Sequence, residues 1–277
     1  RISDFAPNAK FVHVDIDASE IDKNVQTHAG VVGDLKAVLE QLLPKVEANV
    51  HIDWLRHIEE LKAQHPSHVV RESDELLPQY VLKRLTETTQ GRGIVVTGVG
   101  QHQMWAAQHC QFKDPNTFIT SGGLGTMGFE VPAALGAQVG LPDATVWSVC
   151  GDGGFQMTMC DIATAVESGA DVKFAILNNT NLGMVHQLQD VFFEKEYMAS
   201  EFSANPDFVK IAEAYGIRGI RVTKKEEVVD AVQQAMETAG PVIVDFMVKE
   251  DEIVFPFIPS GQSVKEMLEE PTFEGSA

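Results

Sequence analysis

The sequence predicts an α/β protein with a doubly wound parallel sheet, preceded by the end of a second α/β domain. Short apolar runs alternate with amphipathic helical segments from residue 77 to residue 248, which is the pattern of strands joined by crossover helices. A polar, proline-containing segment at 66–75 separates this region from an earlier and shorter pattern of the same kind. Such alternation favours parallel strands with helices on both faces of the sheet.

The first region, residues 1–49, has the pattern of the last part of an α/β domain, and residues 50–76 supply one further helix and a linker. Asp34 is expected to cap the helix that follows it. The elements expected here are strand 10–17, helix 19–24, strand 31–32, helix 35–43 and helix 52–64.

The second region, residues 77–248, carries the regular alternation, and residues 249–277, rich in acids and prolines, are expected to form a C-terminal arm. The strands expected in it are 94–97, 117–120, 144–150, 172–177, 219–222 and 242–247. The helices expected between them are 79–86, 104–109, 131–139, 155–168, 184–189, 208–215 and 225–238.

The charge, the hydrophobic pattern and the cysteines argue against several classes of protein. A formal net charge of −19 over 277 residues argues against nucleic acid or an anionic membrane as a partner. No run of about 18 apolar residues and no signal peptide are present, and the three cysteines, Cys110, Cys150 and Cys160, have no metal-ligand or disulfide spacing. We therefore expect a reduced, cytoplasmic protein.

Two polar motifs follow consecutive apolar runs in the middle of the second region. Gly-Asp-Gly-Gly begins at Gly151, directly after one run, and Asn-Asn ends at Asn179, directly after the next. A right-handed crossover brings both strand ends to the same edge of the sheet, so Asp152 and Asn179 are expected to lie close together. A carboxylate and an amide oxygen suit Mg²⁺, which keeps its other positions for water and phosphate oxygens.

The glycines beside Asp152 allow backbone N–H groups to approach an anion, and the N-terminus of the following helix favours negative charge. Taken singly, Gly-Asp-Gly is mostly a solvated turn and Asn-Asn is mostly a loop. Their combination, each directly after a buried strand, is far more specific. The sequence therefore predicts a site for a metal-bridged diphosphate.

Several segments together resemble the acetolactate synthases (acetohydroxyacid synthases), large subunit, which depend on thiamine diphosphate. These segments are GVGQHQMWAAQ at 98–108, TSGGLGTMGF at 120–129, GDGGFQMT at 151–158 and LNNTNLGMV at 177–185. HVDIDASEIDKN at 13–24 and VFPFIPSG at 254–261 are similar too, so the resemblance covers nearly the whole chain.

The resemblance implies roles for individual residues. The expected Mg²⁺ ligands are Asp152, Asn179 and the backbone carbonyl of Asn181. The residues expected to bind thiamine diphosphate are Gln101, His102, Gly125, Met127, Gly151, Gly153, Gly154, Asn181, Gly183 and Met184, with Gly125 and Met127 supporting its rings. The adenosine end of FAD, largely structural in this family, is expected at Asp15, Ile16, Glu20 and Asp34. From the pattern alone, an acidic strand end is equally well explained as a helix cap.

The implied reaction condenses two pyruvates, or pyruvate with 2-oxobutyrate, with loss of CO₂. The products are 2-acetolactate or 2-aceto-2-hydroxybutyrate, on the route to isoleucine and valine. The family's glutamate that activates thiamine lies in an N-terminal domain that this sequence does not contain. No catalytic residue is therefore expected in this chain, which we expect to be inactive alone and to be part of a longer polypeptide. The resemblance also implies a homodimer or tetramer, with a small regulatory subunit as a further partner.

Three positions depart from the family. Leu188 stands where most members carry a tryptophan that favours 2-oxobutyrate and stacks on sulfonylurea-type inhibitors, so a weaker preference for 2-oxobutyrate and resistance to these inhibitors are expected. His186 replaces a usual arginine, and Glu130 replaces a small residue. A carboxylate near a diphosphate is unfavourable unless it points to solvent or meets a cation.

Two other interpretations remain open. The chain is compatible with another thiamine-dependent carboligase or decarboxylase, such as a glyoxylate carboligase or a sulfoacetaldehyde acetyltransferase, which product analysis would distinguish. It is also compatible with a separately encoded cofactor-binding subunit that acts only with a partner, which the intact mass of the native polypeptide would distinguish.

Overall fold

Six parallel strands form the sheet of the larger of two units into which the chain divides, and the computed structural model describes residues 1–65 and 69–270. The larger unit is His68–Val254, and the smaller combines Arg1–Ser67 with Phe255–Ala277. Parts of the expected linker, 66–68, and of the expected arm, 271–277, lie outside the described residues.

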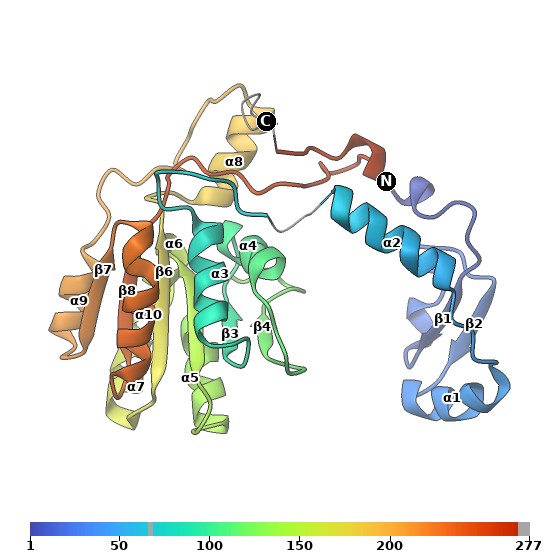
Figure 1. Ribbon diagram of the computed structural model, residues 1–277, viewed down its shortest axis with the longest axis horizontal. Coiled ribbons are helices and arrows are strands. Elements are labelled where there is room, and N and C mark those ends of the chain that lie inside the picture. Colours follow the sequence, from blue (N-terminus) through green and yellow to red (C-terminus); the bar gives the residue numbers. More distant parts are fainter. Residues whose placement is uncertain (66–68, 271–277) are drawn as a thin grey trace. The chain divides into compact units, whose positions relative to one another are not determined.

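The sheet has the strand order β4-β3-β5-β6-β8-β7, and every neighbouring pair is parallel (Figure 1). Its strands are β3 Ile94–Thr97, β4 Phe118–Thr120, β5 Val146–Gly151, β6 Val172–Asn178, β7 Arg218–Val222 and β8 Val242–Met247. The prediction of an α/β fold with a parallel sheet is confirmed, and the bounds of β3 are as expected.

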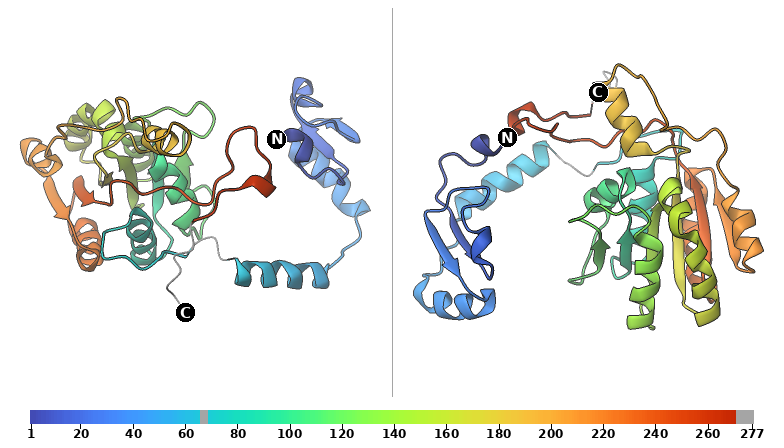
Figure 2. Two further views of the ribbon diagram at one scale, coloured as in Figure 1. Left: turned by 90° about the horizontal axis from the view of Figure 1, so that it is seen from above. Right: turned by 180° about the vertical axis from the view of Figure 1, so that it is seen from behind.

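Helices cover both faces of this sheet, as Figures 1 and 2 show from opposite sides. They are α3 Pro78–Thr88, α4 Gln101–His109, α5 Glu130–Gly140, α6 Asp152–Thr158, α7 Ile162–Ser168, α8 Gly183–Phe192, α9 Phe208–Ala214 and α10 Val228–Glu237. The short 3-10 helices Met159–Asp161 and Lys225–Glu227 also belong to this unit, whereas Val264–Glu266 belongs to the smaller one.

Two apolar cores result, one on each face. Successive strand side chains point to opposite faces, so in β5 Trp147 and Val149 join one cluster while Val146 and Cys150 join the other. The first cluster includes α3, α4 and α10, and the second includes α5, α6, α7 and α9. Burial on both faces explains why the strands are continuous apolar runs rather than alternating ones.

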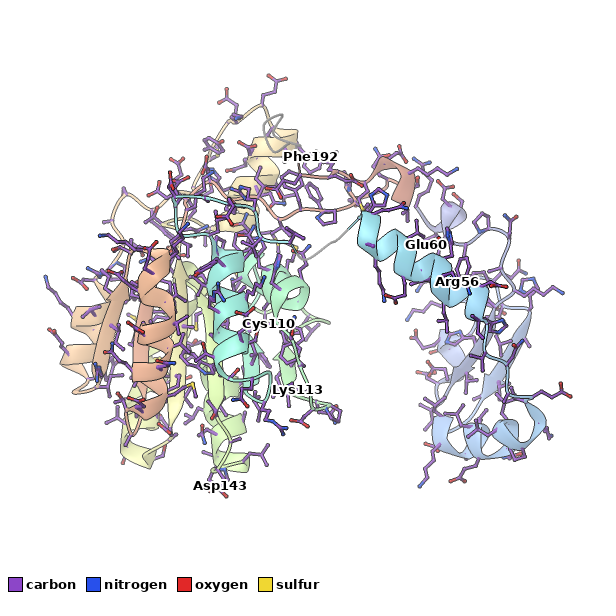
Figure 3. All side chains as sticks on the ribbon, in the orientation of Figure 1. Arg56, Glu60, Cys110, Lys113, Asp143 and Phe192 are labelled. Atoms are coloured by element: carbon purple, nitrogen blue, oxygen red, sulfur yellow. The ribbon has the colours of Figure 1, made fainter. Side chains whose placement is uncertain are left out.

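The strand order reverses direction between β3 and β5. From β3 the chain proceeds outward to β4, then returns to the other side of β3 and continues through β5 and β6. In open α/β sheets the crevice beyond the carboxyl ends of the strands at such a reversal is the usual ligand site. Phe192, at the end of α8, and Asp143, just before β5, lie at opposite ends of this unit (Figure 3). The segments that follow β3, β5 and β6 therefore meet at the α8 end.

Lys173 fastens the opposite end of the central strand β6. Its side chain is only 2% exposed, and its ammonium group pairs with Asp171 and donates to the carbonyls of Thr238 (2.6 Å) and Gly240 (2.7 Å). A buried ammonium is tolerated only when its donors are used. Here it joins β6 to the turn before β8.

Four helix predictions were wrong in detail. The helix expected at 104–109 begins at Gln101, and the helix expected at 225–238 is a 3-10 turn, Lys225–Glu227, followed by α10. The helix expected at 155–168 begins at Asp152 and is divided into α6, a 3-10 turn and α7, so Asp152 lies in a first helical turn rather than in a loop. The helix expected at 19–24 is only a 3-10 turn, Ala18–Glu20. The glycines after Asp152 have low helix propensity, which concealed the early start.

The smaller unit contains a parallel pair of strands, β1 Val12–Asp15 and β2 Ala29–Val32, with helices α1 Leu35–Leu42 and α2 Ile52–Gln64 and the 3-10 turns Ile2–Asp4 and Leu43–Lys45. None of these strands and helices contains a fully buried residue. Asp34 caps α1 by accepting from the amide of Ala37 at 3.0 Å, as expected. Residues near the two ends of the described chain meet within this unit, where Arg1 pairs with Glu266 at 3.1 Å.

Candidate functional site

A pocket of about 190 Å³ lies at the carboxyl ends of β3, β5 and β6, where the strand order reverses. This volume is more than ten times what one water molecule needs, so the pocket has room for part of an organic ligand. All ten residues expected to bind thiamine diphosphate, and all three expected metal ligands, line it. Its lining consists of Val99, Gly100, Gln101, His102, Trp105, Gly125, Met127, Gly151, Asp152, Gly153, Gly154, Leu177, Asn179, Asn181, Leu182, Gly183, Met184 and Val185.

Asp152 is the one acidic residue of this lining, and the residue is 1% exposed. Oδ1 accepts from the amide of Gly153 at 3.0 Å, and Oδ2 accepts from the side-chain amide of Asn205 at 2.8 Å. Burial raises the pKa of Asp152 to about 7, and the hydrogen bonds from Asn205 and from backbone amides offset only part of that effect. A cation bound in the pocket would stabilise the ionised form of this buried carboxylate.

Asn179 faces the same pocket with its amide orientation set by Gln101. Its Nδ2 donates to Oε1 of Gln101 at 3.3 Å, which leaves Oδ1 to accept, as it does from the amide of Asn181 at 3.4 Å. Thr180, between the two asparagines, adopts φ +58°, a left-handed conformation that turns the chain sharply after β6. The arrangement gathers one carboxylate and several amide oxygens, the hard donor set that Mg²⁺ accepts.

Gln101 is hydrogen-bonded within the protein on every side. Its Nε2 donates to Oε1 of Gln187 at 2.8 Å and to the carbonyl of Glu252 at 2.7 Å, while its Oε1 serves Asn179. In this arrangement Gln101 supports Asn179, and it has no unused N–H group to offer a diphosphate.

Several glycines line the pocket, and two of them are tightly enclosed by neighbouring side chains. A Cβ on Gly183 would overlap Oε1 of Gln101, and a Cβ on Gly153 would lie 2.7 Å from Cδ2 of Leu182. Neither position has space for a side chain, so only glycine fits there without a shift of its neighbours. Gly183 is the first residue of α8, whose free N–H groups suit an anion.

His102 lies under the turn that enters α4. It is 6% exposed, and burial lowers its pKa to about 4, so the imidazole is neutral at physiological pH. Its Nε2 has no hydrogen-bond partner among the described residues. A buried polar atom without a partner in the wall of a pocket is the observation expected where a polar ligand group completes the site.

Apolar side chains form the remaining wall. Trp105 is 2% exposed, and Met127 projects from the segment in which Gly125 adopts φ +68°. The wall can therefore accommodate a ring system beside the polar end of the pocket.

Leu188 and His186 lie on α8, outside the pocket lining. Leu188 is 45% exposed, while the His186 ring stacks on Tyr197 with centroids 4.1 Å apart. The role expected for Leu188 in substrate selectivity stays a prediction.

Glu130 was expected to be tolerated only if its carboxylate pointed to solvent or met a cation. Among the described residues it does neither. It is 0% exposed, and neither carboxylate oxygen has a hydrogen-bond partner of good geometry within the described chain. Its carboxylate is wedged between Gly98 and Gly154, where a Cβ on Gly154 would lie 2.5 Å from Oε1. Burial raises the pKa of Glu130 to about 7, although the amides of Gly128 and of Glu130 itself lower it slightly.

The four residues expected to bind FAD belong to the smaller unit. Asp15 ends β1 and accepts from the amide of Asp17 at 2.8 Å, Glu20 pairs with Lys23, and Ile16 is 75% exposed. Asp34 caps α1, and at the end of the first strand Asp17 caps the next 3-10 turn by accepting from the amide of Ser19, whereas Asp15 caps no helix. Binding of FAD at the four residues stays a prediction.

Two residues of the site went unnoticed in the sequence. Asn205 bonds to Asp152, and Gln187 bonds to Gln101 and is the only buried residue of α8. Gln187 lies in the helix that follows Gly183. A polar residue on the inner face of an amphipathic helix is a signal that could have indicated its role. Asn205 lies in a loop and carried no such signal.

Two negative findings concern the described residues. They contain no group of three or more His, Cys, Asp or Glu side chains that could hold a metal ion, so a cation at Asp152 would depend on amide and carbonyl oxygens. No helix among them is both long and apolar enough to cross a membrane.

Comparisons with known proteins match both units. The family model described as thiamine pyrophosphate enzyme, C-terminal TPP binding domain, matches residues 98–246, and the model for the central domain of the same enzymes matches residues 1–42. The chain is 44% identical over 273 residues to the acetolactate synthase large subunit of Corynebacterium glutamicum, covering 95% of this chain and 44% of that protein.

Two further relatives are similar in the same way. The chain is 42% identical to an acetolactate synthase of Mycobacterium leprae, over 96% of this chain and 45% of that protein. It is 39% identical to the acetolactate synthase isozyme 2 large subunit of Escherichia coli K12, over 97% of this chain and 48% of that protein. The chain thus spans about half the length of the curated relatives it matches.

Proposed function

Because the chain belongs to the thiamine pyrophosphate enzymes, we propose that it is the cofactor-binding part of an acetolactate synthase. The proposal rests on one observation: Asp152, Asn179 and Gly183 line the same pocket, at the point where the strand order reverses. The names of the relatives support the choice of reaction. On this proposal the complete polypeptide condenses two pyruvates, or pyruvate and 2-oxobutyrate, with loss of CO₂.

The residues present fit a magnesium-bridged diphosphate. Asp152, the Asn179 side chain and the carbonyl of Asn181 would hold the cation, because they supply oxygen donors and because Asp152 is otherwise a buried carboxylate without an opposite charge. The amides that follow Gly153 and Gly183 would bind phosphate oxygens. When bound, thiamine diphosphate supplies the carbanion chemistry of the reaction.

The apolar wall would hold the organic part of the cofactor. Met127, Trp105 and Leu177 exclude water from that side of the pocket, and neutral His102 offers Nε2 to a polar group. The chain's own contribution is therefore to bind and orient the cofactor. The proposal assigns the activating glutamate to the preceding part of a longer polypeptide.

Binding of thiamine diphosphate to this chain tests the proposal directly. Trp105 lines the pocket, so tryptophan fluorescence should change when thiamine diphosphate and Mg²⁺ are added together. Asp152→Asn should abolish the change, whereas Asp143→Asn, an exposed aspartate at the other end of the unit, should leave it intact. A wild-type chain that does not bind the cofactor would overturn the proposal.

The product assay follows. The chain alone should release no acetolactate from pyruvate, while the native polypeptide, if its intact mass is near twice 30.3 kDa, should release it. Measurable acetolactate from the chain alone would contradict the placement of the activating glutamate. A different product would favour another thiamine-dependent carboligase, and a native mass near 30.3 kDa would favour a separate cofactor-binding subunit.

We further propose that residues 1–49 are the end of the central domain, 50–76 a helix and linker, 77–248 the diphosphate-binding domain and 249–277 an arm. The matches at 1–42 and 98–246 support this division. FAD binding near Asp15 and Asp34, and a homodimer or tetramer with a regulatory subunit, are the corresponding proposals for the complete protein. Flavin absorbance and the mass of the purified native assembly would test them.

A further inference from the structure

Asn205 lies outside every motif of the pocket, yet its side chain contacts the pocket's only carboxylate. Its Nδ2 donates to Oδ2 of Asp152 at 2.8 Å and to Oδ1 of Asn178 at 2.9 Å. Its Oδ1 accepts from Nε2 of Gln156 at 3.0 Å. Both N–H groups and the carbonyl oxygen are used, so the orientation of this amide is fully determined by its neighbours.

The residues that follow Asn205 are also held in place. Pro206 restricts the chain directly after it, and Asp207 caps α9 through the amides of Val209 and Lys210. Asp207 also accepts from Nη2 of Arg221 at 2.7 Å. Asn205 therefore reaches Asp152 from a fixed position rather than from a free loop.

The hydrogen bonds continue from Asn205 into the sheet. Nδ2 of Asn178 donates to Oδ1 of Asp245 at 3.0 Å, and Asp245, 0% exposed, pairs with Arg221 at 3.0 Å. The charge of Asp245 is thus balanced by a guanidinium, while that of Asp152 meets only hydrogen-bond donors among the described residues. A buried carboxylate that is oriented but not neutralised is prepared for a cation from outside the chain.

We propose that Asn205 is a positioning residue, which holds the Asp152 carboxylate in the orientation needed to ligate Mg²⁺. The inference rests on the proposed function of the pocket. Partners of this kind, which contact a metal ligand rather than the metal, typically change metal affinity 10–100-fold when removed.

The matched variants are Asn205→Leu and Gln138→Leu. Asn205→Leu keeps the size of the side chain and removes its amide. Gln138 is a second buried amide, and its Nε2 donates to the carbonyls of Leu141, Pro142 and Ala144 at the other end of the unit. Its loss therefore reports the general cost of removing a buried amide donor. Asn205→Ser, too short to reach both partners, serves as a milder variant if Asn205→Leu does not fold.

The measurement is the affinity for Mg²⁺ and for Ca²⁺ in the presence of thiamine diphosphate, from the fluorescence of the whole chain. Asn205→Leu should weaken Mg²⁺ binding about 10–100-fold. It should weaken Ca²⁺ binding less, because Ca²⁺ tolerates irregular ligand geometry that Mg²⁺ does not. Gln138→Leu should change neither affinity more than about 2-fold, since it is remote from the metal.

The outcomes separate the two proposals. A wild-type chain that binds neither cation with the cofactor overturns the proposed function, and this inference with it. A wild-type chain that binds Mg²⁺, together with Asn205 variants of unchanged affinity, overturns the inference alone. An equal loss of both cations would show that Asn205 only holds the loop, and would also overturn it.

Discussion

Replacement of Glu130 by glutamine should change how the stability of the protein depends on pH. The carboxylate is buried between Gly98 and Gly154 without a partner of good geometry, and its pKa is raised from 4.5 to about 7 because burial penalises the charged form. Well below pH 4.5 the group is protonated in both the folded and the unfolded chain, so its ionisation contributes nothing to the free energy of unfolding. Between pH 4.5 and 7 the unfolded chain ionises while the folded chain keeps its proton, and stability falls as pH rises.

The magnitude follows from the difference in pKa. A difference of about 2.5 corresponds to about 3 kcal/mol, since each pKa unit is worth about 1.4 kcal/mol. The loss is complete above pH 7 and is absent in Glu130→Gln, which cannot ionise. The free energy of unfolding of the variant minus that of the wild type should therefore rise by about 3 kcal/mol from pH 4.5 to pH 8.

Urea denaturation of both proteins across this pH range provides the assay. Other titrating groups, including the buried Asp152, are present in both proteins and cancel in the difference. If the difference in free energy of unfolding between the two proteins stayed constant with pH, the reasoning would be refuted. Such a result would mean that Glu130 has the same pKa in the folded and in the unfolded chain. Gly98→Ala supplies a check on the geometry, since it should be tolerated only when Glu130 is also replaced by alanine.

Three further predictions concern other positions. Gly183→Ala should reduce affinity for thiamine diphosphate at least 10-fold in a fluorescence titration, because the new Cβ overlaps Gln101; Gly136→Ala, with open space around it, should not. Leu188→Trp in the complete enzyme should raise selectivity for 2-oxobutyrate over pyruvate in a competition assay and restore sulfonylurea sensitivity, and unchanged selectivity would end that hypothesis. Lys173→Met should lower the free energy of unfolding by about 2–4 kcal/mol, because the carbonyls of Thr238 and Gly240 lose their donor, and a loss below about 0.5 kcal/mol would show that water replaces it.

The sequence was informative wherever a single short-range rule decided the structure. The apolar run at 94–97 became β3 with those bounds, and the rule that parallel strands end at one edge correctly brought Asp152 and Asn179 to one pocket. Prediction from the sequence failed where the local preference of the residues and the tertiary packing disagree. The glycines after Asp152 favour a turn in isolation, but the packing of Phe155 against Phe174 and Phe208 holds a helix there.

Long-range hydrogen bonds were the part that the sequence could not supply. Asn205 is 53 positions from Asp152, and no periodicity relates a loop asparagine to a strand end. Burial was equally hidden for Glu130, since an acidic residue at the start of a helix is normally solvated and favoured by the helix dipole. Only the packing of α5 against β3, β5 and α6 explains why it is enclosed.

The division of the pocket among separate segments has a consequence for folding. Its walls come from residues 99–105, 125–127, 151–154 and 177–185, which meet only after β3, β5 and β6 have aligned. An unfolded chain therefore has no such site, and any ligand of the pocket binds the native state alone. By mass action, a ligand at 100 times its dissociation constant would add about 2.7 kcal/mol to the free energy of unfolding. The supply of that ligand would then determine how much of the protein stays folded long enough to escape proteolysis.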